Sequence, residues 1–214
     1  MNTEINSIEK IVKESKSYER HFPRLSNPEF YRREETALKP FQKVIEDTRY
    51  YPTIVGLPLR AKEDEIRKNE VLMRRLVRYA GNSAYFLSRM IGSVYQDQIS
   101  DQVGGTHHES LILCTDDASV RTIQHEMFHF VHDQLLKETA RMDIERMFEY
   151  AQDYEKLVDN RQINSGEYFA FGGEYYLTKR LLLSPERKLR KKDPKLHELI
   201  ADVLTGKEEL ICVP

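Results

Sequence analysis

The five residues His125-Glu126-Met127-Phe128-His129 constrain the fold of this chain more than any other feature of its sequence. In an α-helix, residues four positions apart are neighbours on one face, so both imidazoles can reach a single Zn²⁺ at about 2.0–2.1 Å. Glu126, beside the first histidine, is predicted to act as the general base on a zinc-activated water. The pattern therefore predicts a helix across these residues with a metal site on one of its faces.

The residues around this pattern favour a metal site over a chance match. Leu111–Cys114 is predicted to form a short strand, either buried or at an edge of a sheet. A turn at Thr115–Asp117 follows, in which Asp116 or Asp117 is predicted to cap the next helix. Apolar residues then recur at three- and four-residue steps beside the histidine face, as in an amphipathic helix: Val120, Ile123, Met127, Phe130, Val131 and Leu135.

Composition predicts one medium-sized domain and gives no argument for a membrane or nucleic-acid partner. The chain has 214 residues and a formal net charge of -2. We expect an N-terminal extension over residues 1–60, interrupted by prolines and wrapping the core, and a domain over residues 61–214. The basic run Arg187–Lys192 is interpreted as a solvated helix face, because no aromatic side chains alternate with it to stack on bases.

The sequence contains no recognisable membrane span or secretory signal. No apolar run approaches the roughly 20 residues that span a bilayer. The first residues lack the basic start and apolar core of a secretory signal. The two cysteines, Cys114 and Cys212, have no metal-ligand spacing and predict no disulfide framework. We therefore expect a cytoplasmic protein, or one exported without a cleaved signal peptide.

Turn and helix signals predict an α+β fold that is mostly helical with a small sheet. Residues 61–80 have helical spacing, and at least one strand is favoured within 84–96, because the strand at 111–114 needs a partner. Gly104-Gly105 is predicted to form the turn before that strand, and His107-His108 a polar loop pair that could approach a substrate. Further helices are predicted over about 137–158, over 166–183 with Asn164 or Ser165 as cap, and from Asp193-Pro194 to about Leu204, closed by Gly206.

A third metal ligand is expected on the helix that begins near Gly166. Catalytic zinc sites use three protein ligands and leave a fourth position open. Glu167 and Glu174 share one face of this helix but lie about 10 Å apart along its axis, so only one of them can bind the ion. Gly172 and Gly173 each cost about 1 kcal/mol inside a helix. Their presence predicts a close approach of this helix to the helix that carries the histidines.

These motifs together resemble a known group of enzymes. The order of a strand, an HExxH helix and a helix with Glu167-Tyr168-Phe169-Ala170 resembles the gluzincin-like metallopeptidases, including the anthrax lethal factor catalytic domain and the Pro-Pro endopeptidases. The segment Asn164–Tyr176 is most similar to the Mlc titration factor A peptidases, and Pro194-Lys195-Leu196 resembles their final helix. The resemblance covers about residues 111–204. It implies a zincin-like fold, Glu167 as the third zinc ligand, and Glu174 as a neighbouring residue that supports the ligands.

The chain departs from this family at the residue that binds the oxyanion. The family has a tyrosine seven residues before the ligand glutamate, and that position here is Asn160. An asparagine amide can donate a hydrogen bond to an oxyanion but has a shorter reach. Tyr154 or Arg161 could take the role instead.

A second departure follows the second histidine of the motif. The family has an aspartate three residues after it, where this chain has His132, followed by Asp133. Asp133 is expected to orient groups near the site. His132 lies too far along the helix from His125 to share one ion with both motif histidines, so it is expected beside the site or on the surface.

The sequence therefore predicts a zinc-dependent metallopeptidase that acts on a peptide or protein, and we expect an endopeptidase. One zinc ion would be held by His125, His129 and, by resemblance, Glu167. Glu126 would take a proton from the attacking water and pass it to the leaving amine. If the strand at 111–114 is an edge, it would pair with an extended substrate. The alternatives are a non-catalytic zincin-like metal-binding module that recognises a protein partner, and a secreted effector or toxin peptidase.

Overall fold

The computed structural model describes residues 28–57, 90–91, 105–151, 164–178 and 185–211. These residues are mostly helical and contain one small sheet, so the predicted α+β class is confirmed. The elements in chain order are α2 (Pro28–Leu38), the 3₁₀ helix η1 (Lys39–Phe41), α3 (Gln42–Thr48), β1 (Thr53–Leu57), β2 (Gly105–His108), β3 (Leu111–Thr115), α7 (Val120–Phe130), the π-helical turn η2 (Val131–Leu135), α8 (Glu138–Tyr150), α9 (Ser165–Leu177), α10 (Pro185–Lys192) and α11 (Pro194–Thr205).

The sheet has the strand order β1-β3-β2. β1 runs parallel to β3, and β2 runs antiparallel to it. All five residues of β3 are buried, which explains their unbroken apolar sequence. The predicted strand at 111–114 is therefore the central strand, and the expectation that it could be an edge is wrong. Among the strands that the structure describes, the edges are β1 and β2.

The turn before β3 differs from the prediction. Gly105 is the first residue of β2, and the chain turns at Glu109 and Ser110, where Glu109 has a φ of 50°. His107 and His108 are accordingly strand residues, and their interpretation as a loop pair is wrong. Of the segment 84–96, only residues 90–91 are described, and they are helical.

Residues 28–57 contribute to the core of the molecule. Phe30, Phe41 and Val44 are fully or almost fully buried in the same hydrophobic cluster as the residues of α7 and α9. The same segment supplies β1, which the sequence did not predict. Residues 1–27 and 58–89 lie outside the described part of the chain, as do the expected domain boundary at residue 60 and the helix over 61–80.

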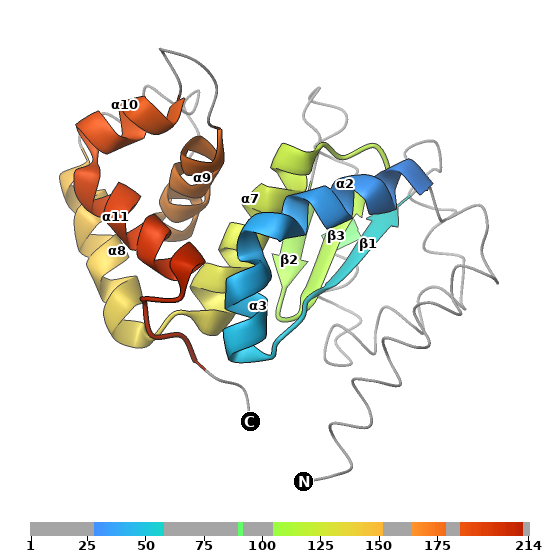
Figure 1. Ribbon diagram of the computed structural model, residues 1–214, viewed down its shortest axis with the longest axis horizontal. Coiled ribbons are helices and arrows are strands. Elements are labelled where there is room, and N and C mark those ends of the chain that lie inside the picture. The colour runs from blue at the N-terminus through green and yellow to red at the C-terminus, as the bar shows by residue number, and fades with distance from the viewer. Residues whose placement is uncertain (1–27, 58–89, 92–104, 152–163, 179–184, 212–214) are drawn as a thin grey trace, which may run out of the picture.

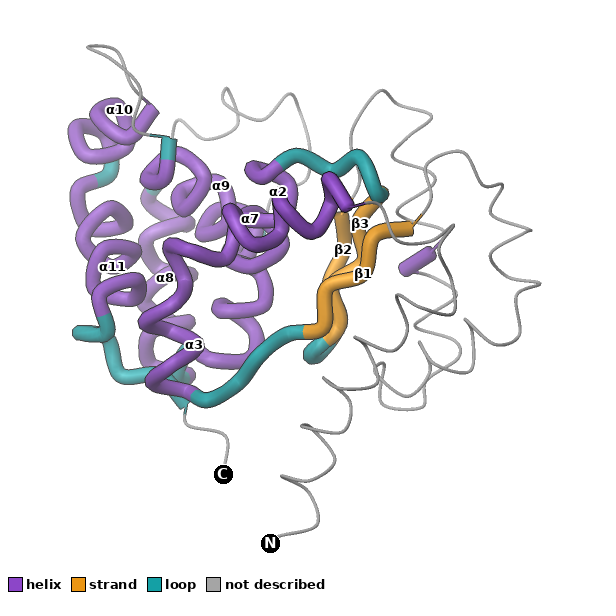
Figure 2. Tube along the Cα trace, turned by 45° about the vertical axis from the view of Figure 1, so that its right-hand side comes forward, coloured by secondary structure: helices purple, strands orange, loops and turns teal. Residues whose placement is uncertain are grey.

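Helix α7 lies between the sheet and the other C-terminal helices. Figures 1 and 2 show the sheet on one side of α7 and the group α8–α11 on the other. α7 contacts α9, α2, β2 and β3. Its N-cap is Ser119, whose side chain accepts a hydrogen bond from the backbone N–H of Thr122 at 3.1 Å. The predicted caps, Asp116 and Asp117, lie in the turn before it.

The later helices begin where their capping residues predict. Asn164 Oδ1 accepts a hydrogen bond from the Glu167 N–H at 2.9 Å, which makes Asn164 the cap of α9. Asp193 caps α11, and Gly206 ends it in the left-handed conformation with a φ of 72°. Both were predicted from the sequence. α8 ends at Tyr150 and α9 at Leu177, each followed by a described non-helical residue, so the predicted ends near 158 and 183 are too late. Residues 152–163 and 179–184 themselves lie outside the described part of the chain.

Gly172 and Gly173 of α9 face different neighbours. A Cβ at Gly173 would lie 2.3 Å from ring atoms of Phe128 on α7, whereas a Cβ at Gly172 would lie 2.6 Å from Leu196 on α11. The predicted close approach of this helix to α7 is confirmed at Gly173. Gly172 instead allows α11 to approach.

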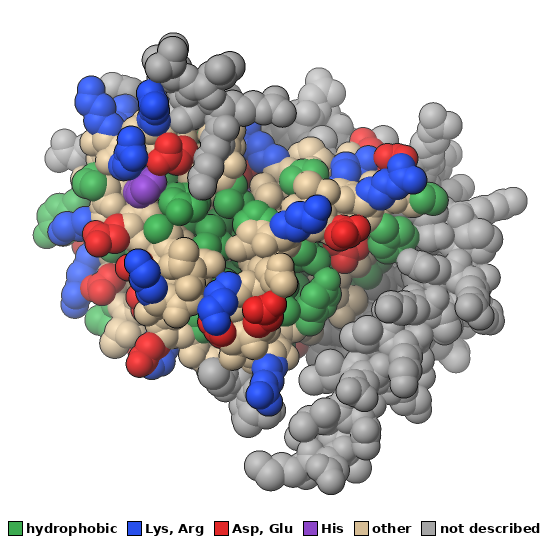
Figure 3. Space-filling view, in the orientation of Figure 1, with side chains coloured by type: hydrophobic (Ala, Val, Ile, Leu, Met, Phe, Trp, Pro, Cys, Tyr) green, Lys and Arg blue, Asp and Glu red, His purple; other side chains and the backbone are tan. Residues whose placement is uncertain are grey.

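The surface of the described residues carries mixed charges. Lys, Arg, Asp and Glu side chains alternate over the face in Figure 3. The basic residues of α10 are exposed while Leu189 is buried, so the interpretation of this run as an exposed helix face is confirmed. Within the described ranges, no helix has the length and apolar character needed to cross a bilayer.

Candidate functional site

The two motif histidines lie side by side on α7. His125 Nε2 and His129 Nε2 are 3.0 Å apart, and the ring centroids are separated by 4.7 Å. This pairing follows from their four-residue spacing on a helix. Both side chains are 13% exposed, so the two Nε2 atoms meet in a largely buried position rather than in open solvent.

Glu167, in the first turn of α9, reaches both histidines. Its Oε2 lies 3.2 Å from His125 Nε2, and its Oε1 lies 3.4 Å from His129 Nε2. Burial pushes the pKa of Glu167 up, but hydrogen bonds from both histidines outweigh that effect and hold the pKa well below its usual range. The side chain is therefore a carboxylate at neutral pH, which is the form that binds a metal ion.

The geometry of these three side chains is compatible with one bound metal ion. Their ligand atoms lie within 4.8 Å of one another. Tetrahedral zinc with bonds of about 2.0–2.1 Å has ligand atoms roughly 3.3 Å apart. The two Nε2 atoms are 3.0 Å apart, and each lies 3.2–3.4 Å from a different oxygen of Glu167. Two imidazoles and one carboxylate are also a donor set that catalytic zinc sites use. His125, His129 and Glu167 would be the residues that hold the ion.

Glu174 lies behind His125 and does not join this group. Its side chain is 7% exposed and accepts a hydrogen bond from Arg121 Nη2 at 2.8 Å. Its other oxygen, Oε1, is 3.8 Å from His125 Nδ1, a buried atom without a hydrogen-bond partner in the described structure. Because a ligand histidine normally donates its second N–H to an acceptor, Glu174 is in position to orient His125.

Glu126 is buried on the side of α7 that faces β2. It is 6% exposed, and a Cβ at Gly105 would lie 2.6 Å from its Cγ and 2.8 Å from its Oε1. A larger residue at the start of β2 would therefore displace the Glu126 side chain. Burial raises the pKa of Glu126; the nearby His129, His125 and His107 oppose this, and the net pKa remains above the usual range. A carboxyl group of this kind can hold a proton that it has taken up.

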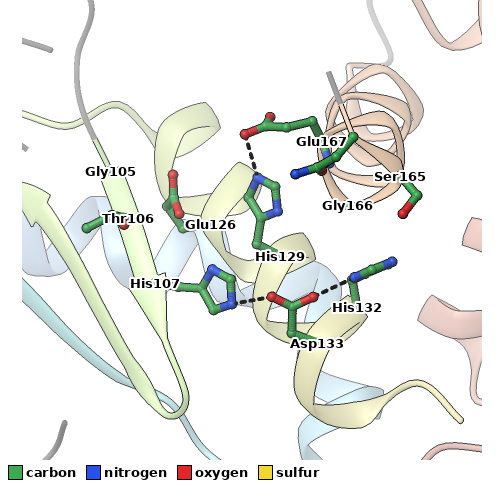
Figure 4. A pocket seen from close by; sticks show the side chains of 11 residues that line it. Gly105, Thr106, His107, Glu126, His129, His132, Asp133, Ser165, Gly166 and Glu167 are labelled. Carbon is green, nitrogen blue, oxygen red and sulfur yellow. Dashed lines mark hydrogen bonds and ion pairs between the residues drawn. The ribbon is translucent and has the colours of Figure 1, made fainter. Parts of the chain in front are cut away.

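A cavity of about 460 Å³ opens beside these residues. Figure 4 shows that its walls come from β2, from α7 with η2, and from the first turn of α9. Its lining is mainly polar and includes several titratable side chains. The lining residues are Gly105, Thr106, His107, Glu126, His129, His132, Asp133, Asn164, Ser165, Gly166 and Glu167.

A second polar cluster, the His107–Asp133–His132 cluster, lines the same cavity. Asp133 Oδ2 lies 2.9 Å from His107 Nε2, and Asp133 Oδ1 lies 2.6 Å from His132 Nδ1. Burial pushes the pKa of Asp133 up, but the hydrogen bonds from both histidines keep it well below the usual range. His132 is buried at 8% exposure, so the alternative of a surface position is wrong.

The sequence suggested only that the His107-His108 pair could approach a substrate, and it gave His107 no defined contact. His107 projects from the edge strand, and its ring lies parallel to that of His129 with the centroids 5.6 Å apart. The signal that could have found it is a polar pair just before the buried strand that precedes the HExxH helix. Asn160, Tyr154 and Arg161, the residues considered for the oxyanion, lie outside the described residues.

Comparison with known proteins adds no relative. No protein-family model matches the chain, and neither curated proteins nor solved structures gave a match. The likeness to gluzincin-like metallopeptidases therefore rests on the residues that carry it, chiefly those at 125–129 and 164–176.

Proposed function

We propose that this chain is a zinc-dependent metallopeptidase that hydrolyses peptide bonds. The observation that carries the proposal is the convergence of His125, His129 and Glu167, whose ligand atoms lie within 4.8 Å of one another, beside the buried carboxyl of Glu126. The resemblance to gluzincin-like metallopeptidases supports the same assignment from the sequence.

The residues of the site suit hydrolysis. When bound, a zinc ion would supply Lewis-acid chemistry, lowering the pKa of a water toward about 7 and polarising a carbonyl group. Glu126 takes the proton from the attacking water and passes it to the leaving amine. Its burial favours this proton transfer, because desolvation raises its pKa and lets the carboxyl hold the proton between the two steps.

The edge strand β2 favours a peptide as the substrate. Among the described residues, β2 pairs only with β3, and it passes directly over Glu126. An extended chain can add to such an edge by backbone hydrogen bonds. β2 thus replaces the strand at 111–114, which is central, as the docking edge for substrate.

The test measures zinc content and cleavage of a mixed peptide library for the wild type, Glu126→Gln and the control Glu138→Gln. Glu138 is an exposed residue in the first turn of α8. The proposal expects one zinc per chain in all three proteins, with cleavage lost only in Glu126→Gln, by at least 100-fold for a general base. Cleavage that survives in Glu126→Gln would remove Glu126 as the base.

One feature of the sequence favours a second function, a metal-binding module that recognises a protein partner without cleaving it. Asn160 occupies the position where the resembling family has its oxyanion-binding tyrosine. The same experiment separates the two functions. Full zinc occupancy with no cleavage of any library peptide would favour the binding module.

A further inference from the structure

The His107–Asp133–His132 cluster has no part in the hydrolytic chemistry described above, yet it faces the same cavity. His107 is the third residue of β2 and is 13% exposed in its side chain. Since side chains alternate along a strand, His108 points to the opposite face of β2, where it lies 4.0 Å from Glu109. Of the two histidines, only His107 lines the cavity.

Asp133 holds the His107 ring from the opposite wall. Asp133 belongs to η2, where the chain makes a π turn with a hydrogen bond from Leu136 N to Val131 O at 2.9 Å. This turn ends the helix, because Leu136 after it is extended. Both carboxylate oxygens of Asp133 are used, one by His107 and one by the buried His132, so the carboxylate has a fixed orientation.

These hydrogen bonds define which atom of His107 remains for a ligand. A carboxylate only accepts hydrogen bonds, so His107 donates its Nε2–H to Asp133. In the neutral ring, Nδ1 then carries no proton and is an acceptor. Figure 4 shows the ring between β2 and Asp133, with the edge away from Asp133 turned toward Glu126 and His129.

We propose that His107 is a substrate-binding residue whose Nδ1 accepts a hydrogen bond from a backbone N–H of a peptide held along β2. The inference rests on the proposed function, because that function supplies the peptide. An extended peptide on β2 presents backbone N–H groups to this wall of the cavity. Asp133 is a positioning residue, since it acts only through the His107 ring.

The alternative is that His107 only ties β2 to η2 through Asp133. Two substitutions separate these roles. The amide of Gln reaches about as far as His Nε2, so His107→Gln keeps the tie to Asp133 and removes the acceptor at Nδ1. The amide of Asn reaches about as far as His Nδ1, so His107→Asn keeps an acceptor there and loses the tie. His108→Gln on the same strand is the control.

The probe is a zinc-binding tripeptide hydroxamate, tested by isothermal titration against zinc-loaded wild type and variants. A second probe carries N-methyl groups in place of its peptide N–H groups. We expect His107→Gln to bind the first probe about tenfold more weakly than the wild type, with zinc affinity unchanged. His107→Asn should lose less affinity, and N-methylation should weaken binding to the wild type more than to His107→Gln.

The possible failures are distinguishable. If the wild type retains no zinc, the proposed function fails and the role of His107 fails with it. If zinc is retained and His107→Gln binds the probe as the wild type does, only the role of His107 is overturned. A thermal stability loss in His107→Asn together with full probe binding in His107→Gln would establish the structural tie instead.

Discussion

Replacing Gly173 with alanine should destabilise the protein and weaken metal binding at the same time. The new Cβ would lie 2.3 Å from Phe128 Cδ2 and Cε2, whereas ordinary contact begins at 3.4 Å. The Phe128 ring cannot simply turn away, because it is fully buried between Phe41 and Phe169, with centroids at 4.9 and 5.6 Å. Either the ring or helix α9 must therefore move by about 1 Å.

The expected size of the effect follows from two opposing contributions. Overfilling a confined core costs about 1–3 kcal/mol, and the upper end applies to a ring confined on both sides. Removing a glycine from a helix interior returns about 1 kcal/mol. The net loss in the free energy of unfolding should be about 2 kcal/mol, measured by urea denaturation of the metal-free protein. Because α7 carries two of the proposed ligands and α9 the third, a shift of about 1 Å should also weaken zinc binding at least tenfold.

Gly172→Ala is the matched control. Its Cβ would meet the end of the flexible Leu196 side chain on α11, so repacking is easier and α7 is not displaced. We expect zinc affinity, measured by competition with a chromophoric chelator, to stay within about twofold of the wild type, since the α7–α9 contact is untouched. Equal zinc affinities for Gly173→Ala and Gly172→Ala would refute the claim that Gly173 sets the distance between the ligand-bearing helices.

Three further predictions follow from the site. Glu174→Gln should lower zinc affinity about 10- to 100-fold, because Glu174 is the residue positioned to orient His125. The free energy of unfolding of the metal-free protein in urea should change little. An unchanged zinc affinity would show that Glu174 does not orient His125. Asn164→Ala should cost about 1 kcal/mol in urea denaturation, because it removes the cap of α9, and no loss would argue against that cap. Zinc at 100 times its dissociation constant should add about 2.7 kcal/mol to the free energy of unfolding, or roughly 5–10 °C to the melting midpoint, and a chelator should reverse this gain. Glu167→Gln should show no such shift in the melting midpoint. A full shift in that variant would exclude Glu167 as a ligand.

Local signals predicted the helices of the site well. The HExxH spacing, the cap at Asn164 and the pair Asp193 and Gly206 each depend on a few adjacent residues. The predicted cap of α7 was wrong because three residues of types that commonly cap helices, Asp116, Asp117 and Ser119, stand close together in the sequence. The cap is the last of them, Ser119.

The sheet was harder to predict because its pairings join distant segments. β1 is only five residues long and lies between Pro52 and Pro58, which read as interruptions. β2 consists of Gly-Thr-His-His and has no apolar alternation. No local pattern shows that β3 lies between these two strands, because that depends on contacts across the whole fold.

The site residues divide in the same way, into those that local spacing predicts and those that depend on distant contacts. The spacing of Glu167 and Glu174 left both open as ligands, because they share a helix face. The two glutamates differ in the atoms of α7 that they reach. Glu167, in the first turn of α9, lies near Nε2 of both histidines, whereas Glu174, in the third turn, lies only near Nδ1 of His125. The sequence suggested that His107 could approach a substrate but placed it in a loop, because its contact with Asp133 depends on a distant part of the chain.

X-ray absorption spectroscopy of the protein loaded with one equivalent of zinc tests the central claim most directly. The account predicts two imidazole nitrogens and one or more oxygen ligands at about 2.0–2.1 Å, with the imidazole signal reduced in His129→Ala. Sulfur ligands at about 2.3 Å, or a spectrum that His129→Ala leaves unchanged, would contradict the assignment of His125, His129 and Glu167 as the metal site.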